Sequence, residues 1–142
     1  MMHGMKKSFD YFSEHFGPYQ YRQMRILEFP NYDVKAQSFP NTVPFSEGIG
    51  FILDIDDEED VDMAFFVTAH ELSHQWWGHQ VIPANANGAI MLTEGMAEYV
   101  KAKVLLHSRN EKQYYKFLEK SDFVDLNSSK AFINFCLLAP VI

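Results

Sequence analysis

The chain has 142 residues, of which 47% are hydrophobic and 15% aromatic, a composition that excludes a disordered protein. Its net charge of −7 comes from one run of seven acidic residues between positions 54 and 62, and no basic stripe indicates a nucleic-acid partner. The single cysteine, Cys136, excludes an intrachain disulfide framework and a cysteine-rich metal site.

This length predicts one domain over residues 1–142. The first residues lack the apolar stretch of a secretory signal, so we expect a cytoplasmic protein by default, or a membrane-associated one if the chain is a fragment of a larger protein. The apolar segment 131–142 has twelve residues, fewer than the roughly 20 that a membrane-spanning helix needs. The sequence leaves the oligomeric state open.

The N-terminal part is predicted to contain one helix and two strands. Three aromatic residues at helical spacing predict a short amphipathic helix that ends at Gly17-Pro18, namely Phe9, Phe12 and Phe16. Residues 19–29 alternate loosely and predict a strand that Pro30 stops, and residues 31–44 predict an irregular connection. A second strand is expected over residues 48–53, where two glycines permit the close approach of a ligand or a backbone.

The acidic run is interpreted as a solvated turn whose last acids favour the positive end of the next helix. A calcium loop is the alternative, but the acids are mostly consecutive and the run lacks the central glycine of such a loop. The following helix is expected from Met63 to Trp77, with a stop at Gly78. One face of it is apolar and predicted to be buried, and it consists of Phe65, Ala69, Leu72 and Trp76.

Residues 79–88 contain proline, asparagine and glycine and are predicted to form a loop. A second helix is expected from Leu92 to His107, with a core face that comprises Met96, Ala97, Val100 and Val104. Asn110 has the position of an N-cap for a third helix, in which Tyr114, Phe117 and Leu118 would form the packing side. Residues 121–142 are left unassigned.

The segment from His70 to His74 reads His-Glu-Leu-Ser-His. On a helix of about 3.6 residues per turn, two histidines four apart project from one face and can hold one metal ion. Glu71 lies about 100° around the helix by the same geometry, beside the metal, as the general base of a zinc peptidase requires. The alternative is that the motif arose by chance in a polar helix of a metal-free interaction domain.

A catalytic zinc needs a third protein ligand from another element. Glu94 is the best candidate, because the nineteen residues between His74 and Glu94 allow a helix end, a loop and the first turn of an antiparallel helix. His79 and Glu98 compete for this role. The chain would have to fold back sharply to use His79, so we expect it in a structural or rim position.

Glu98 lies one turn after Glu94 on the same helix face. It is placed to accept the other ring N–H of a zinc-bound histidine and so to fix the tautomer of that ring. The alternative for Glu98 is an ordinary solvated glutamate.

The residues around both metal-binding segments resemble the zinc core of the aminopeptidase N-like gluzincins. The resemblance rests on the continuation Gln75-Trp76-Trp77-Gly78 after the motif and on the run Leu92-Thr93-Glu94-Gly95-Met96-Ala97. It is strongest over residues 44–105, and a bacterial branch fused to transporter permeases is the most similar. The spacing of nineteen residues is the thermolysin-like one, whereas this family usually has eighteen.

The resemblance implies an α+β, thermolysin-like zinc peptidase core: a small β-sheet edge and metal-binding helices, truncated before the helical subdomain. It implies Zn²⁺ as the cofactor and a peptide with a free N-terminus as the substrate. The family's Gly-Ala-Met-Glu-Asn motif is absent as such, and residues 44–50 hold its place. Glu47 is then expected to bind the substrate's amino group, and Gly48, Ile49 and Gly50 to pair with its backbone as an edge strand.

The family stabilises the oxyanion with a tyrosine roughly sixty residues beyond the glutamate ligand, which would fall past Ile142. We therefore expect this chain to be the zinc-binding core of a larger peptidase or a truncated copy. The alternative to an active peptidase is a folded, metal-binding remnant that turns over little or no substrate, because loss of one oxyanion donor costs about 10² to 10³ in rate.

Overall fold

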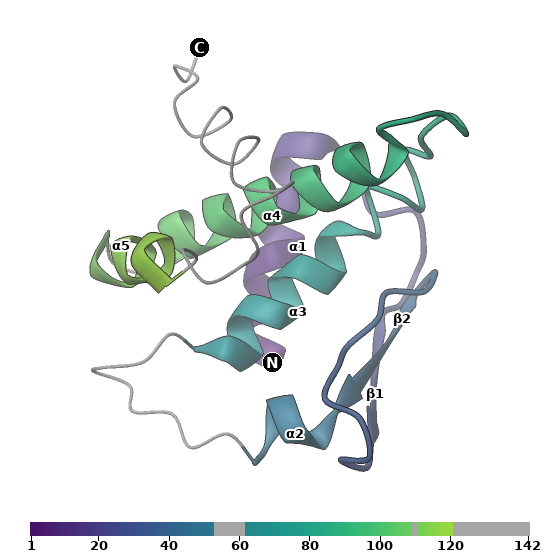
Figure 1. Cartoon of the computed structure of the whole chain (residues 1–142). Coiled ribbons are helices and arrows are strands. Elements are labelled where there is room, and N and C mark those ends of the chain that lie inside the picture. Colours follow the sequence, from purple (N-terminus) through teal and green to yellow (C-terminus); the bar gives the residue numbers. More distant parts are fainter. Residues whose placement is uncertain (53–61, 109–110, 121–142) are drawn as a thin grey trace.

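The computed structural model describes residues 1–52, 62–108 and 111–120 of the chain. In these ranges five helices and a two-stranded sheet form an α+β structure (Figure 1). The elements in chain order are α1 (Met2–Phe16), β1 (Arg25–Phe29), β2 (Thr42–Ser46), α2 (Glu47–Gly50), α3 (Met63–Ser73), α4 (Ala89–Ser108) and α5 (Glu111–Lys120).

The core lies where α1, α3 and α4 pack against one another, with the strands and α2 to one side (Figure 1). Phe12 of α1 is fully buried, and its ring centroid lies 5.3 Å from that of Trp76. The indole N–H of Trp76 donates to the carbonyl of Gly17, 3.0 Å away. The predicted N-terminal helix is therefore confirmed, and an aromatic cluster ties its end to the turn after α3.

The two strands pair in parallel, with Arg25 opposite Thr42 and Phe29 opposite Ser46. The strand predicted over residues 19–29 is right only for its second half. The strand predicted over residues 48–53 is wrong for its described residues, because residues 47–50 form the helical turn α2. The side chain of Ser46 accepts a hydrogen bond from the backbone N–H of Gly48 and caps this turn, which ends β2 one residue before Glu47.

The glycines of α2 lie close against side chains of other segments. Gly48 is buried, and a Cβ on it would lie 2.3 Å from Oδ1 of Asn31. The neighbouring Ile49 is only 8% exposed. Gly48, Ile49 and Gly50 therefore do not provide the edge strand expected for pairing with a substrate.

The N-terminus of α3 is capped by Asp62, whose side chain accepts a hydrogen bond of 2.8 Å from the backbone N–H of Phe65. This agrees with the expected role of the last acids of the acidic run, of which residues 54–60 lie outside the described ranges. The helix ends at Ser73, earlier than the predicted Trp77, because the N–H groups of Gln75 and Trp76 bond to carbonyls three residues back and tighten the last turn. His74 keeps right-handed helical angles, and Gly78 has the positive φ of +124° that the following turn requires.

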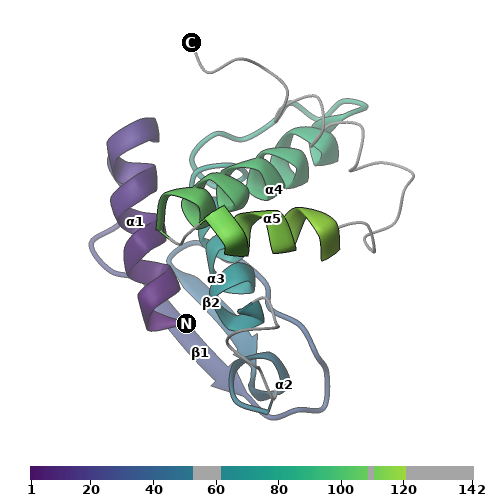
Figure 2. The same ribbon diagram turned by 90° about the vertical axis from the view of Figure 1, so that its left-hand side faces the viewer.

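The second predicted helix is confirmed as α4, which begins three residues before Leu92. Ala97 and Val100 are fully buried, as expected, and Val104 is 1% exposed. The third predicted helix is confirmed as α5, which lies beside α4 (Figure 2), while its expected cap Asn110 and the side chains of Phe117 and Leu118 lie outside the described part. None of the helices in the described ranges is long and apolar enough to cross a membrane.

Candidate metal centre

Three side chains from α3, its C-cap and α4 converge on one point. Nε2 of His70 lies 3.2 Å from Nε2 of His74. Oε2 of Glu94 lies 3.4 Å from each of these two nitrogens. Among the described residues these three form the one group of histidines and acids whose ligand atoms lie close enough to hold a metal ion.

The spacing of the three atoms fits a tetrahedral zinc ion. Nitrogen and oxygen ligands bind zinc at about 2.0–2.2 Å, so two ligands of a tetrahedron lie about 3.4 Å apart. The observed separations of 3.2 and 3.4 Å match that edge. Two histidines and one carboxylate are also the donor set of catalytic zinc sites, which leave the fourth position open.

In each histidine ring, Nδ1, the nitrogen that faces away from the cluster, lies close to a second group of the protein. Nδ1 of His70 lies 2.9 Å from Oε1 of Glu98. Nδ1 of His74 lies 3.1 Å from the carbonyl oxygen of Trp77, in the turn that follows α3. Because the carbonyl of Trp77 can only accept, it requires a proton on Nδ1 of His74, and in the neutral ring Nε2 then carries the lone pair that a metal needs.

Electrostatics bind the cluster together in the metal-free protein. Hydrogen bonds from His70 and His74 hold the pKa of Glu94 far below its usual range, although half of this side chain is exposed. Burial opposes protonation of His70, but the carboxylates of Glu94 and Glu98 outweigh it and raise the pKa of His70. A divalent cation between the two Nε2 atoms would meet the carboxylate of Glu94, while Glu98 lies on the other side of the His70 ring.

Glu71 lies beside the two histidines without being part of the cluster. It is 8% exposed, and its burial raises the pKa of its carboxyl group above the usual value, against the attraction of His70 and His74. The backbone of Ser38 donates a hydrogen bond to it. A raised pKa and a fixed orientation suit a carboxylate that takes up and releases a proton.

A pocket of about 180 Å³ adjoins Glu71 between α3 and α4. Its walls include both charged and apolar side chains, contributed by Met63, Phe66, Val67, His70, Glu71, Glu98 and Lys101. A group bound next to the metal cluster therefore has space on the side where Glu71 lies.

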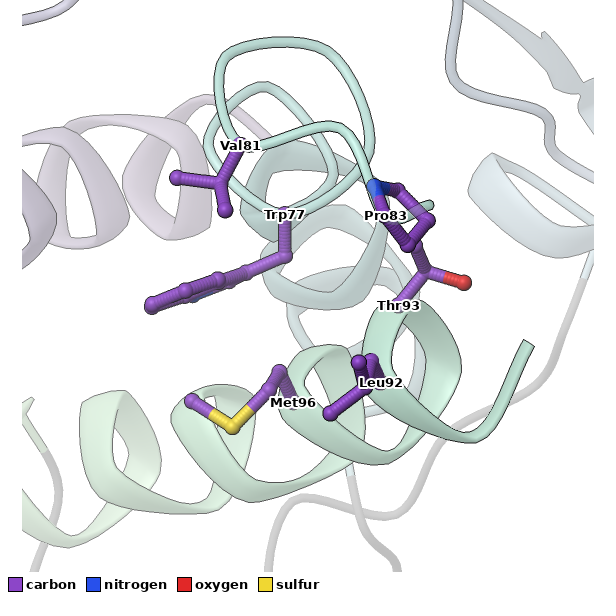
Figure 3. Close-up of a pocket in the computed structure, with 6 residues that line it drawn as sticks. All are labelled: Trp77, Val81, Pro83, Leu92, Thr93 and Met96. Atoms are coloured by element: carbon purple, nitrogen blue, oxygen red, sulfur yellow. The ribbon is translucent and has the colours of Figure 1, made fainter. Parts of the chain in front are cut away.

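A second pocket, of about 350 Å³, lies on another face of α4. Figure 3 shows the Trp77 side chain between Val81 and Met96, and the lining is almost entirely apolar. Leu92 and Met96 are each two residues from Glu94, which places them about 160° around the helix from it. This pocket lies between α4 and the segment after α3, and none of the three converging side chains lines it.

The other residues singled out in the sequence lie apart from the cluster. His79 places no ligand atom in the His70–His74–Glu94 group, and burial lowers its pKa. Glu47 is the first residue of α2, and its Oε1 accepts a hydrogen bond of 2.8 Å from the backbone N–H of Asn31.

Three features of the site were missed in the sequence. The carbonyl of Trp77 and the backbone of Ser38 act through the main chain, which leaves no mark on the residue type. The third is Lys101, which is 5% exposed and lies with Nζ 2.6 Å from Oε1 of Glu98. The signal for Lys101 was its spacing, because it follows Glu94 by seven residues and Glu98 by three on one helix face.

Comparison with known proteins adds one finding. A search of curated proteins finds no match to the chain. The model of the peptidase family M1 domain matches residues 1–132, which extends well beyond residues 44–105 on both sides. Because this match covers most of the sequence and the metal cluster lies inside it, the chain belongs to peptidase family M1.

Proposed function

We propose that the protein is a zinc-dependent peptidase with a thermolysin-like metal site that removes residues from the free N-terminus of peptides. The observation that carries the proposal is the tetrahedral spacing of the three ligand atoms of His70, His74 and Glu94. Membership of a peptidase family whose members are zinc enzymes supports the same conclusion.

The roles of the side chains follow from their positions. Zinc in such a site supplies a Lewis acid that polarises a peptide carbonyl and acidifies water. Glu71 removes a proton from the attacking water and delivers it to the leaving amine, which its raised pKa favours. His70, His74 and Glu94 hold the ion, while Glu98 and the carbonyl of Trp77 hold the two rings.

Glu47 is proposed to bind the free amino group of the substrate. Its support is the sequence context, in which residues 44–50 hold the place of the family's exopeptidase motif. The structure changes the way this residue is presented, because Glu47 begins a helical turn instead of a strand. A carboxylate there can form an ion pair with an α-ammonium group.

The test measures zinc and hydrolysis on the same preparations. The parent should bind about one zinc per chain and cleave aminoacyl chromogenic substrates, but not their N-acetylated forms. Glu71→Gln should retain zinc and lose about 10²- to 10⁴-fold in rate, because general base catalysis is lost. Glu14→Gln, on the exposed face of α1, serves as the matched control and should hydrolyse at the parental rate.

The outcomes separate the alternatives. A parent without zinc would rule out the proposal and favour a metal-free domain. Bound zinc with equal rates for the parent and Glu71→Gln would favour the catalytically inactive remnant. If Glu47→Ala left the preference for a free N-terminus unchanged, the assignment of Glu47 would be wrong.

A further inference from the structure

Lys101 is a buried cation behind the metal cluster. Its side chain is 6% exposed, and its ammonium group lies 3.8 Å from the centroid of the Phe66 ring. Burying a lysine is costly unless its charge is compensated, and lysines are rarely buried to this extent. The compensation comes mainly from Glu98, whose Oε1 lies 2.6 Å from Nζ.

The same carboxylate oxygen joins Lys101 to the metal ligands. Oε1 of Glu98 is 2.6 Å from Nζ of Lys101 and 2.9 Å from Nδ1 of His70. Nε2 on the opposite side of that ring is one of the three converging ligand atoms. A continuous series of contacts therefore runs from Lys101 through Glu98 and the imidazole of His70 to the metal position.

The pair with Lys101 holds Glu98 in place, because Nζ lies 2.6 Å from the same carboxylate oxygen that faces His70. Glu71 and Glu94 also lie close enough to interact electrostatically with Lys101. Without Lys101, the carboxylates of Glu71, Glu94 and Glu98 would lose their buried ammonium neighbour. We then expect repulsion between these carboxylates to move Glu98 away from His70 towards solvent.

We propose that Lys101 is a positioning residue of the metal centre, which fixes Oε1 of Glu98 against Nδ1 of His70 and thereby orients the His70 ring for zinc. This inference rests on the proposed zinc-dependent function. It assigns to Lys101 a role in metal affinity and not only in joining α4 to α3. Residues that hold a metal ligand in place through its non-coordinating atoms typically contribute about 10- to 100-fold in metal affinity.

The experiment measures the zinc Kd of the full-length chain by competition with a chromophoric chelator. Lys101→Met should raise the Kd about 10- to 100-fold. Lys101→Arg keeps the charge and should restore most of the affinity. Lys103→Met is the matched control, because Lys103 is on the same helix with its Nζ 5.3 Å from the centroid of the Tyr99 ring, and it should bind zinc as the parent does.

A double-mutant cycle with Glu98→Gln tests whether Lys101 acts through Glu98. Once Glu98 is neutral, adding Lys101→Met should change the Kd little further. If Lys101→Met alone fails to fold, comparison of Glu98→Gln with the double variant still decides, because the double variant removes both charges of the Lys101–Glu98 pair. Two full and additive effects would overturn the proposed route through Glu98.

A further readout separates positioning from a structural contribution. In the metal-free protein, the ring ¹⁵N signals of His70 should report a proton on Nδ1 in the parent and in Lys103→Met, and lose this preference in folded Lys101→Met. An unchanged tautomer together with an unchanged Kd in Lys101→Met would overturn the role of Lys101 and leave the zinc peptidase proposal intact. A parent that binds no zinc would overturn both proposals.

Discussion

Gln75 connects the segment that carries the histidines to the loop of residues 38–41, whose backbone contacts the general base Glu71. The side chain is fully buried, and its Nε2 donates to Oγ of Ser38 at 2.7 Å and to the carbonyl of Phe39 at 2.9 Å. Its Oε1 accepts a hydrogen bond of 2.9 Å from the backbone N–H of Asn41. Because the backbone of Ser38 also contacts Glu71, this one amide fixes the loop against both the histidine motif and the base.

We expect Gln75→Leu to lower the free energy of unfolding by about 3 kcal/mol, since it leaves one buried and several partly buried groups without a hydrogen bond. Urea denaturation of the metal-free protein measures this change. Gln20→Ala is the control, because Gln20 is exposed and contacts only the carbonyl of Gln75 among the hydrogen bonds described here, and it should alter stability little. Equal destabilisation by both changes would contradict the importance given to the Gln75 side chain.

At the residue scale, the sequence predicted the converging histidines and glutamate but missed Lys101 and the groups that act through the backbone. The convergence of His70, His74 and Glu94 follows from helical spacing and from a loop of suitable length. The contacts from Ser38 and Trp77 depend on where distant loops lie, and neither residue type carries that information. The spacing of Lys101 places it on the same helix face as Glu94 and Glu98, but spacing alone does not show that it is buried.

At the scale of elements, α3 and its C-cap carry both histidines and the base, so the N-terminal cap of this helix supports three residues of the centre. We expect Asp62→Ala to reduce the free energy of unfolding by about 1 kcal/mol, because the backbone N–H of Phe65 loses its acceptor. Thermal unfolding followed by circular dichroism measures the change. Asp62→Asn retains a capping oxygen and should stay close to the parent, and a loss as large as that of the alanine variant would argue against capping as the cause.

Helices were easier to predict than strands in this chain. The period of the apolar residues placed α1, α3 and α4 well, because buried faces at helical spacing extend over several turns. Residues 48–50 read as a strand, but the cap that Ser46 provides turns the backbone into a helical turn. A hydrogen bond between neighbouring residues thus outweighed a short apolar run, which by itself suits either structure.

At the scale of the whole molecule, the α+β composition was predicted and the arrangement around the site only partly. The packing of α1 against α3 and the pairing of β1 with β2 involve residues far apart in the sequence, such as Phe12 with Trp76. Such contacts depend on the shapes of side chains from several elements, which periodicity within one element does not encode.

A metal ion would join the end of α3 to α4 across the loop between them and would reduce the conformational entropy of the unfolded chain. An ion held by His74 and Glu94 closes a ring that contains the nineteen residues between them. If the ion constrains the unfolded chain as a cross-link does, closing a loop of this size contributes about 3 kcal/mol. Zinc would then act as a reversible cross-link that stabilises the fold, as well as a cofactor.

Limited proteolysis of the parent, with and without a chelator, tests this consequence. Chelation should accelerate cleavage within residues 80–88, which are largely exposed, while cleavage within the exposed residues 30–35 outside the ring should keep its rate. Equal acceleration in both segments would instead indicate general loosening of the fold. A selective effect would mean that loss of the metal both stops the chemistry and opens the connection between the two helices that carry it.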